Sequence, residues 1–212
     1  MRRFILIHSQ PTPNQNKSKE PHPMSNPVKI AVVIGSLRKD SVSRKAAQVL
    51  AKIAPAHATL DIVEIGDLPL YNEDVEAAGA PESWTRFREE IAAHDAVLFV
   101  TPEYNRSLPG ALKNAIDVGS RPYGEAVWNG KAAAVMSLSP GALGGFGANH
   151  HVRQALSFFE MPVMTQPEAY VGNAFGLFDD SGEFVSDNSK AFFQLFIDRF
   201  VEYVERHRKA HA

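Results

Sequence analysis

Five largely apolar segments recur along this chain, and they limit its possible folds more than any other feature. The first is VKIAVVIG, residues 28–35, which is apolar almost throughout and rich in β-branched side chains. DAVLFVT at 95–101 and KAAAVMSLS at 131–139 repeat the pattern, and ATLDIVEI at 58–65 and MPVM with EAYVG between 161 and 172 complete the set. Strands with no polar face must be covered on both sides, which is typical of a parallel sheet.

Stretches with apolar residues at helical spacing separate these strands. They predict helices at residues 41–54, 83–94, 109–120, 147–160 and 189–209. Ser83 is the expected N-cap of the second helix, and residues 69–83 before it are expected to form a loop. The last helix carries an aromatic stripe that predicts a core-facing side, part of which is a candidate dimer surface: Phe192, Phe193, Phe196, Phe200 and Tyr203.

Strand and helix alternation without interruption is the pattern of α/β folds. We therefore predict a flavodoxin-like, doubly wound, five-stranded parallel sheet of strand order 2-1-3-4-5, with helices on both faces. In this order the winding reverses between strands 1 and 3, and ligands bind above the carboxyl ends of the strands at that point. The loops after residues 28–35 and 95–101 are thus the expected functional site.

Composition excludes several functional classes. The 212-residue sequence has 22% charged residues and a formal net charge of −2, which offers no basic surface for nucleic acid or an anionic membrane. It contains no cysteine, so disulfides, thiolate catalysis and cysteine-ligated metals are excluded. No apolar run approaches the roughly 18–20 residues that cross a bilayer. We predict a soluble, cytoplasmic protein.

The first 27 residues differ in composition from the rest, because they are polar and rich in proline after a short basic and apolar start. The apolar piece FILI is too short for the core of a signal peptide, which needs roughly 7–15 residues. We expect a disordered N-terminal extension at 1–27 and one domain at 28–212.

The loop GSLRKDSVSRK, Gly35 to Lys45, joins the first strand to the first helix. Its serine hydroxyls and two arginines, Arg38 and Arg44, lie at a helix N-terminus, where unpaired backbone N–H groups attract anions. Neither the Walker pattern nor the GxGxxG dinucleotide fingerprint occurs here, so a single terminal phosphate is the expected ligand. The alternative is an N-capped helix behind a solvated loop.

The loop after the third strand opens the stretch TPEYNRSLPGALKNAID, Thr101 to Asp117. Pro102 fixes the backbone, while Glu103 and Asn105 supply hydrogen-bonding groups and Tyr104 offers a flat face. These properties suit a planar ring with heteroatoms along its edge. The alternative is a turn in which Tyr104 packs on its own protein.

The loop after the fourth strand, SLSPGALGGFGA from Ser137 to Ala148, is rich in glycine. Glycines at positions 141, 144, 145 and 147 are expected to let the backbone approach a ligand closely. A flexible connector is the alternative interpretation.

Together, GSLRxxSxS, TPEYNxSxPGALKNAID and SxSxGxxGG resemble the NAD(P)H-dependent FMN reductase family, especially its quinone and chromate reductase branch. The resemblance covers nearly all of Val28 to about Gly172. It implies non-covalent FMN, NADPH or NADH as electron donor, and a small-molecule acceptor such as a quinone, a free flavin, an azo compound or chromate. It implies that hydride passes through flavin N5, with no catalytic side chain, in a homodimer or homotetramer.

The resemblance also assigns residues by position. The FMN phosphate is assigned to Ser36, Arg38, Ser41 and Ser43. One side of the isoalloxazine ring is assigned to Pro102, Glu103, Tyr104 and Asn105, and the other side to Ser139 and Gly141.

Four positions depart from the family's usual pattern. Arg106 replaces a frequent aromatic residue, Ser43 a frequent asparagine, and Phe146 and Gly147 small or basic residues. The substrate and the subunit contacts therefore stay open. Arg106 has two interpretations, an attractor for the NADPH phosphate or an oxyanion, and a solvated surface arginine.

Two other functions are less well supported. His150 and His151 do not predict a metal site, because adjacent residues on a helix point about 100° apart and no third ligand is evident. A flavodoxin-like FMN electron carrier that does not oxidise a nicotinamide is the alternative function. Such carriers favour strong acidity, and the net charge of −2 disfavours this interpretation.

Overall fold

The structure is a computed structural model that describes residues 27–179 and 181–210. The predicted extension at 1–27 lies outside this part of the chain except for Pro27, so its disorder stays a prediction. The carbonyl of Pro27 accepts a hydrogen bond from Arg208 Nη1 at 3.2 Å.

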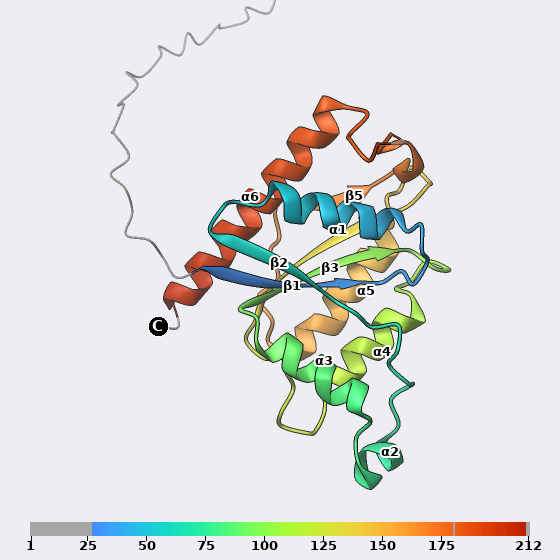
Figure 1. The fold of residues 1–212 in the computed structure, drawn as a ribbon, viewed down its shortest axis with the longest axis vertical. Coiled ribbons are helices and arrows are strands. Elements are labelled where there is room, and N and C mark those ends of the chain that lie inside the picture. Colours follow the sequence, from blue (N-terminus) through green and yellow to red (C-terminus); the bar gives the residue numbers. More distant parts are fainter. Residues whose placement is uncertain (1–26, 180, 211–212) are drawn as a thin grey trace, which may run out of the picture.

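Five parallel strands form one sheet in the order β2-β1-β3-β4-β5, which confirms the predicted flavodoxin-like topology (Figure 1). The strands are β1 Val28–Ile34, β2 Ala58–Val63, β3 Ala96–Pro102, β4 Ala132–Leu138 and β5 Ala169–Val171. Ile30 of β1 pairs with Leu60 of β2 on one side and with Ala96 of β3 on the other. The winding therefore reverses between β1 and β3, as expected.

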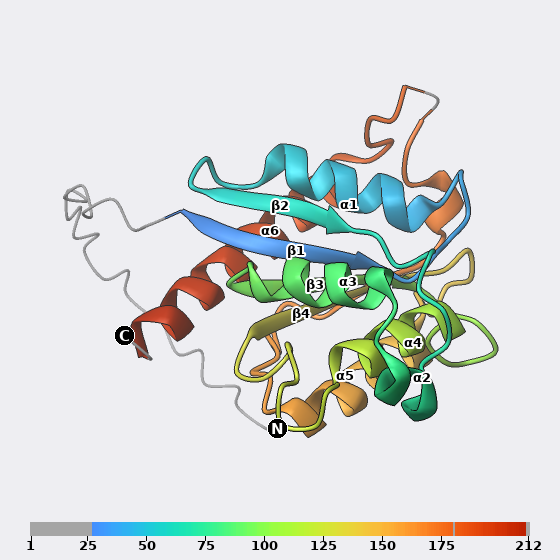
Figure 2. The same cartoon turned by 60° about the horizontal axis from the view of Figure 1, so that its bottom comes forward.

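Helices cover both faces of the sheet, with α1 and α6 on one side and α3, α4 and α5 on the other (Figures 1 and 2). Their bounds are α1 Val42–Ile53, α2 Glu73–Ala78, α3 Glu82–Ala92, α4 Gly110–Gly119, α5 Phe146–Leu156 and α6 Asp187–Ala210. Two 3₁₀ turns, η1 Ser157–Phe159 and η2 Ala174–Gly176, follow α5 and β5.

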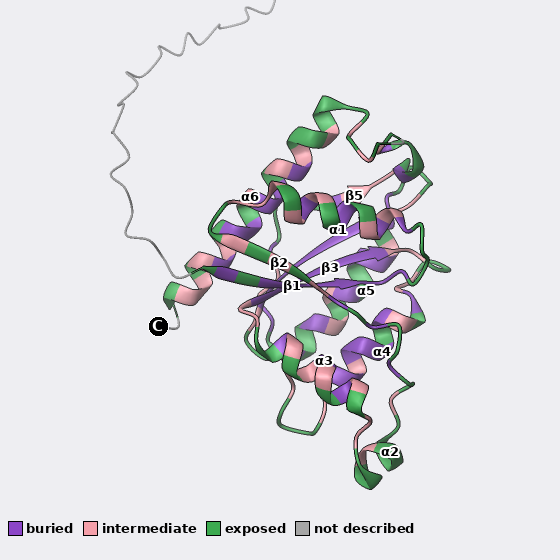
Figure 3. Ribbon diagram, in the orientation of Figure 1, coloured by how far each residue is buried: buried purple, intermediate pink, exposed green. Residues whose placement is uncertain are grey.

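Two apolar cores flank the sheet because successive side chains of each strand point to opposite faces. Ile30 and Val32 pack in the core beneath α1 and α6, whereas Ala31 and Val33 pack in the core with Trp84 of α3. The central strands are buried along their length (Figure 3). The aromatic stripe of α6 is a core face as predicted, with three rings at most 1% exposed: Phe193, Phe196 and Phe200.

Three local predictions were wrong. Part of the expected loop at 69–83 is the helix α2, which Asn72 caps by accepting a hydrogen bond from Asp74 N at 2.9 Å. No residue of this helix is buried, so it carries no apolar periodicity that a sequence pattern could reveal. Ser83 is not an N-cap, because α3 begins at Glu82 behind Pro81.

The fifth extended region is also shorter than expected. Only Ala169–Val171 forms β5, and the MPVM segment contributes a single parallel bridge between Val163 and Ala133. Pro162 and Pro167 have no backbone N–H to donate, which prevents a continuous strand here.

Close packing between β1 and β3, where the winding reverses, explains the glycine that directly follows β1. Gly35 N donates to Val100 O of β3 at 2.9 Å, and a Cβ at Gly35 would collide with Oγ1 of Thr101. The loops after β1 and β3 therefore start side by side, at the edge where the sequence predicts a site.

Candidate functional site

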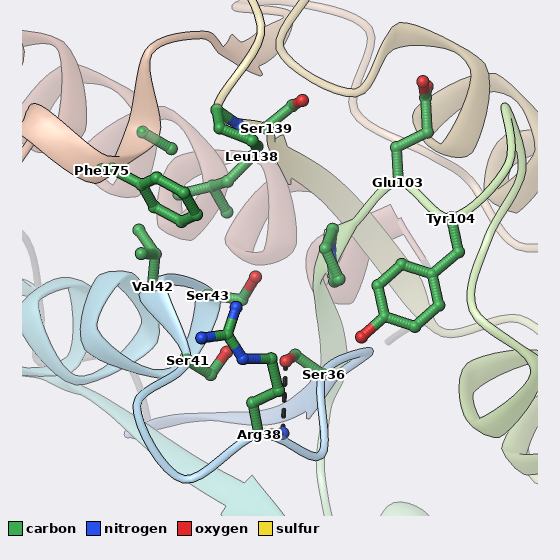
Figure 4. Close-up of a pocket in the computed structure, with 13 residues that line it drawn as sticks. Ser36, Arg38, Ser41, Val42, Ser43, Glu103, Tyr104, Leu138, Ser139 and Phe175 are labelled. Atoms are coloured by element: carbon green, nitrogen blue, oxygen red, sulfur yellow. Dashed lines mark hydrogen bonds between the residues drawn. The ribbon is translucent and has the colours of Figure 1, made fainter.

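A cleft of about 240 Å³ opens at the carboxyl ends of β1, β3 and β4 (Figure 4). Eight of the ten residues assigned from the sequence line it: Ser36, Arg38, Ser41, Ser43, Pro102, Glu103, Tyr104 and Ser139. Asn105 and Gly141 are not among its lining residues. The structure therefore brings most of the predicted set together around one space.

Three buried serines form the floor of the cleft at the N-terminus of α1. Ser36, Ser41 and Ser43 are only 3–4% exposed. Ser41 caps the helix, because its Oγ accepts a hydrogen bond from Arg44 N at 3.3 Å. Ser36 Oγ accepts from Arg38 N at 3.4 Å. These bonds hold the loop in a shape that turns its backbone toward the cleft.

Two polar side-chain groups of this loop that line the cleft have no partner among the described residues. The hydroxyl of Ser43 points into the cleft (Figure 4), and neither it nor the Arg38 guanidinium makes a hydrogen bond or ion pair with any residue at 27–179 or 181–210. Arg38 is exposed and extends across the mouth of the cleft. A hydroxyl open to the cleft, an unpaired guanidinium and a helix N-terminus together make a site for an anion.

Arg44 does not contribute to this site. Its two terminal nitrogens each donate to an oxygen of Glu64 at 2.8 Å, away from the cleft. This hydrogen-bonded pair raises the pKa of Arg44 and lowers the pKa of Glu64. Of the two arginines in the loop, only Arg38 is available to a ligand.

The carboxylate of Glu103 is directed toward α5 and not into the cleft (Figure 4). Oε2 accepts a hydrogen bond from Ala148 N in the first turn of α5 at 3.1 Å, and the side chain is only 11% exposed. Oε1 lies 3.5 Å from Arg106 Nη1. A carboxylate at this position stabilises the start of the helix, so the side chain of Glu103 is a structural element of the loop.

Tyr104 and Asn105 lie in a tight hairpin. Tyr104 and Ser107 exchange two backbone hydrogen bonds of 2.9 and 3.0 Å. Asn105 and Arg106 between them have φ values of 51° and 67°, as in a type I′ turn. Asn105 does not line the cleft, whereas the Tyr104 ring, which is 46% exposed, faces it (Figure 4).

The glycines of the loop after β4 mainly permit packing within the protein, which corrects the expectation that they approach a ligand. A Cβ at Gly144 would collide with the backbone of Tyr170 in β5, and one at Gly147 would lie 2.5 Å from the carbonyl oxygen of Arg106. A Cβ at Gly141 would meet only Ser139 Oγ, at an ordinary contact distance of 3.7 Å, and the N–H of Gly141 donates to the same oxygen at 3.2 Å. Only Gly141 is free to approach a bound molecule.

Five lining residues were missed by sequence reasoning: Val42, Leu138, Pro140, Ala174 and Phe175. Val42, Leu138 and Pro140 are direct neighbours of serines that were predicted, so their inclusion needed only the loop geometry. Ala174 and Phe175 follow the carboxyl end of β5. In the sequence, only this place after a predicted strand could have indicated that they line the cleft.

His150 and His151 make separate contacts. His150 Nε2 lies 3.0 Å from the hydroxyl of Tyr170, and His151 Nδ1 lies 2.8 Å from Ser107 Oγ. No group of three potential metal-ligating side chains occurs in the described part of the chain. Burial, together with a hydrogen bond to Glu168, raises the pKa of Tyr170 to about 12.

Within residues 27–179 and 181–210, no helix combines the length and apolarity that a bilayer span requires.

Comparisons with known proteins agree on one family. The model of the family described as NADPH-dependent FMN reductase matches residues 28–176. A quinone reductase of Pseudomonas putida is 62% identical over 185 residues, which cover 87% of this chain and 99% of that protein. A 2-hydroxy-1,4-benzoquinone reductase of a Burkholderia species is 42% identical over 181 residues, or 85% of this chain and 98% of that one.

A solved structure is similarly close. The flavoenzyme NAD(P)H:(acceptor) oxidoreductase of Paracoccus denitrificans superposes with a TM-score of 0.80 at 43% identity. The match covers 85% of this chain and 98% of that protein.

Proposed function

The chain belongs to the NADPH-dependent FMN reductase family and is an NAD(P)H-dependent FMN oxidoreductase that acts on quinones, and we propose that the cleft above β1, β3 and β4 is where it binds FMN. The observation that carries this proposal is the Ser43 hydroxyl, which faces the cleft from an otherwise buried residue and has no hydrogen-bond partner among the described residues.

The donor set at the loop of residues 35–45, the serine loop, fits a phosphate monoester. Ser36, Ser41 and Ser43 offer hydroxyls at the N-terminus of α1, and Arg38 offers an unpaired guanidinium. Helix N-termini attract anions, and charge-assisted hydrogen bonds from arginine add to that attraction. We assign the FMN phosphate to these four residues.

The remaining assigned residues fit the aromatic part of the cofactor. Tyr104 presents a ring face, and Pro102 and Ser139 lie on the neighbouring strand ends. Because the Glu103 carboxylate is bound to Ala148 N, we assign the role of Glu103 in the ring site to its backbone. Asn105 and Gly141 lie outside the lining of the cleft, and we propose that they contact the ring through their backbones at the rim.

Bound FMN supplies the redox chemistry, because its N5 position accepts and donates hydride. The chain's own residues then need only bind, orient and shield the cofactor, so no general acid, base or nucleophile is assigned. The open face of the cleft beside the exposed Tyr104 is where we propose that nicotinamide and quinone alternate.

We also propose that the protein acts in the cytoplasm, where its nicotinamide donors are found, as a homodimer or homotetramer. Exposed aromatic surface supports self-association, because Tyr123 is 90% and Phe158 82% exposed in one shallow depression.

Anaerobic stopped-flow absorbance tests the proposed function. The FMN-loaded protein is mixed with NADPH or NADH and then with benzoquinone. We expect rapid bleaching of the flavin band followed by rapid recovery. A protein that binds FMN but reacts with neither nicotinamide would instead be an electron carrier, and a protein that binds no FMN would overturn the assignment of the cleft.

A further inference from the structure

Phe175 is an exposed aromatic residue in a segment that also contains two buried apolar residues. It lies in η2 after β5 and lines the cleft, with 67% of its surface exposed. Its neighbours Ala174 and Leu177 are 3% and 7% exposed. The Phe175 ring has no aromatic partner within the residues that the structure describes.

The backbone around Phe175 is held firmly to the loop after β4. Ala174 N donates to Ser139 O at 3.0 Å, and Asn173 N donates to Gly141 O at 3.4 Å. Ser139 N in turn donates to Val171 O at 3.0 Å. The exposed ring is therefore presented at the cleft by a fixed segment.

The position of the ring relative to the serine loop suggests what covers it. In Figure 4 the Phe175 ring lies beside Val42, across the cleft from Tyr104. Phe175, Val42 and Leu138 form an apolar wall next to the polar floor that contains Ser43. A ligand with a phosphate on the floor and an apolar body above it would contact both surfaces.

We propose that Phe175 is a further cofactor-contacting residue, which covers bound FMN on the side opposite Tyr104 and slows its release. The inference rests on the proposed function and adds a residue from a fourth strand end to the ten assigned above. Its physical basis is that an aromatic side chain on a backbone already held in place loses exposed apolar surface on binding at little backbone conformational cost.

The test measures FMN affinity and release, independently of turnover. Apoprotein is titrated with FMN by flavin fluorescence, and release is timed by stopped-flow displacement. For Phe175→Ala we expect a dissociation constant raised about tenfold, mainly through faster release. Phe175→Leu should recover part of the loss, because it restores apolar cover without the ring.

Leu70→Ala is the control, because Leu70 is a large apolar residue that is 80% exposed, does not line the cleft and lies outside the proposed self-association surface. Its FMN affinity should equal that of the unchanged protein. The thermal unfolding of Phe175→Ala apoprotein should also be unchanged, because the ring contributes little packing without a ligand.

The outcomes separate the two proposals. If the unchanged protein binds no FMN, the proposed function fails and this inference fails with it. If the unchanged protein binds FMN and Phe175→Ala binds it equally well, the role of Phe175 alone is overturned. Equal losses in Phe175→Ala and Leu70→Ala, or a less stable Phe175→Ala apoprotein, would also overturn it, because both indicate a general structural effect.

Discussion

The loops after β1 and β3 meet at the same edge of the sheet but use their polar side chains in opposite ways. In the loop after β1, the Ser43 hydroxyl and the Arg38 guanidinium have no partner in the described part of the chain. In the loop after β3, the Glu103 carboxylate is bound to the start of α5 and Asn105 lies in a hairpin turn.

The difference shows that a sequence motif combines two kinds of residue. Some residues, such as Ser43 and Arg38, leave hydrogen-bond donors open for a ligand. Others, such as Glu103, hold the backbone of a loop in the conformation that shapes the cleft. No buried side-chain polar atom lacks a hydrogen-bond partner in the described part of the chain. Buried polar groups need such partners, so the unpaired hydroxyl of Ser43 must be open to the cleft, and it marks the ligand side. The side chain of Glu103 has a structural role, because it links the loop after β3 to the start of α5, although Glu103 belongs to the most specific motif of the chain.

The largest effect is expected when a negative charge is placed in the loop after β1, which tests whether that loop binds the phosphate. Ser43→Asp should raise the dissociation constant of FMN at least a hundredfold, because a carboxylate close to a phosphate repels it by a few kcal/mol at an effective dielectric constant of about 20. Folding stability should not fall, since a carboxylate near a helix N-terminus is favourable. Titration of the apoprotein with FMN measures the effect.

Riboflavin provides the control, because it lacks the phosphate. Its affinity for Ser43→Asp should change far less than that of FMN. A parallel loss of both affinities would mean that the substitution disturbs the whole cleft.

Substitutions at the two arginines of the loop after β1 test which of them contacts FMN. Arg38→Gln should weaken FMN binding about tenfold, as expected for loss of one charge-assisted contact. Arg44→Gln should leave FMN binding unchanged, because Arg44 is paired with Glu64. The same titration at low and high salt should show that only Arg38→Gln reduces the salt dependence. Equal effects of the two substitutions would contradict the assignment.

Because the side chain of Glu103 has a structural role, its removal should lower the free energy of unfolding and leave the affinity for FMN nearly unchanged. Glu103→Ala should lower the free energy of unfolding by about 1 kcal/mol, as for removal of a helix cap, with FMN affinity changed less than about threefold. Glu103→Gln, which keeps an acceptor for Ala148 N, should lose less. Urea unfolding of the apoprotein measures both variants. A tenfold weaker FMN affinity at unchanged stability would identify Glu103 as a ligand group.

The smallest expected effect concerns Tyr170, whose backbone packs on Gly144 in the loop after β4. Burial raises its pKa from 10.0 to about 12. A raised pKa in the folded state means a contribution to stability that is complete below pH 10 and is lost as the pH rises toward 12. The unchanged protein should lose more stability over this range than Tyr170→Phe, without any difference in FMN affinity at pH 7.

Thermal unfolding at intervals between pH 9 and pH 11 measures the difference, and tyrosinate absorbance gives the pKa directly. A Tyr170 that ionises near pH 10 would show that burial at this position is weaker than the structure indicates.

The fold was predictable because the buried strands are recognisable in the sequence as apolar segments without alternation. Both faces of β1 are buried, so VKIAVVI is apolar without alternation, and the order of the strands follows from their alternation with helices. The short helix α2 was missed because it buries no residue, so that only the cap at Asn72 and its acidic first turn specify it.

The cleft was predictable in its location and in eight of its lining residues. Two kinds of information were out of reach. The partners of Glu103 and of the glycines depend on contacts between loops that are distant in sequence, such as Gly147 with Arg106. Phe175 lies in no recognised motif, and its place in the cleft depends on backbone hydrogen bonds between η2 and the loop after β4.

The most direct test of the central claim compares FMN with riboflavin on the same apoprotein. If the serine loop holds the phosphate, FMN should bind at least about a hundredfold more tightly than riboflavin, since several charge-assisted hydrogen bonds depend on that group. Equal affinities for the two flavins would contradict the claim, because they would mean that the open donors of Ser43 and Arg38 do not face the phosphate.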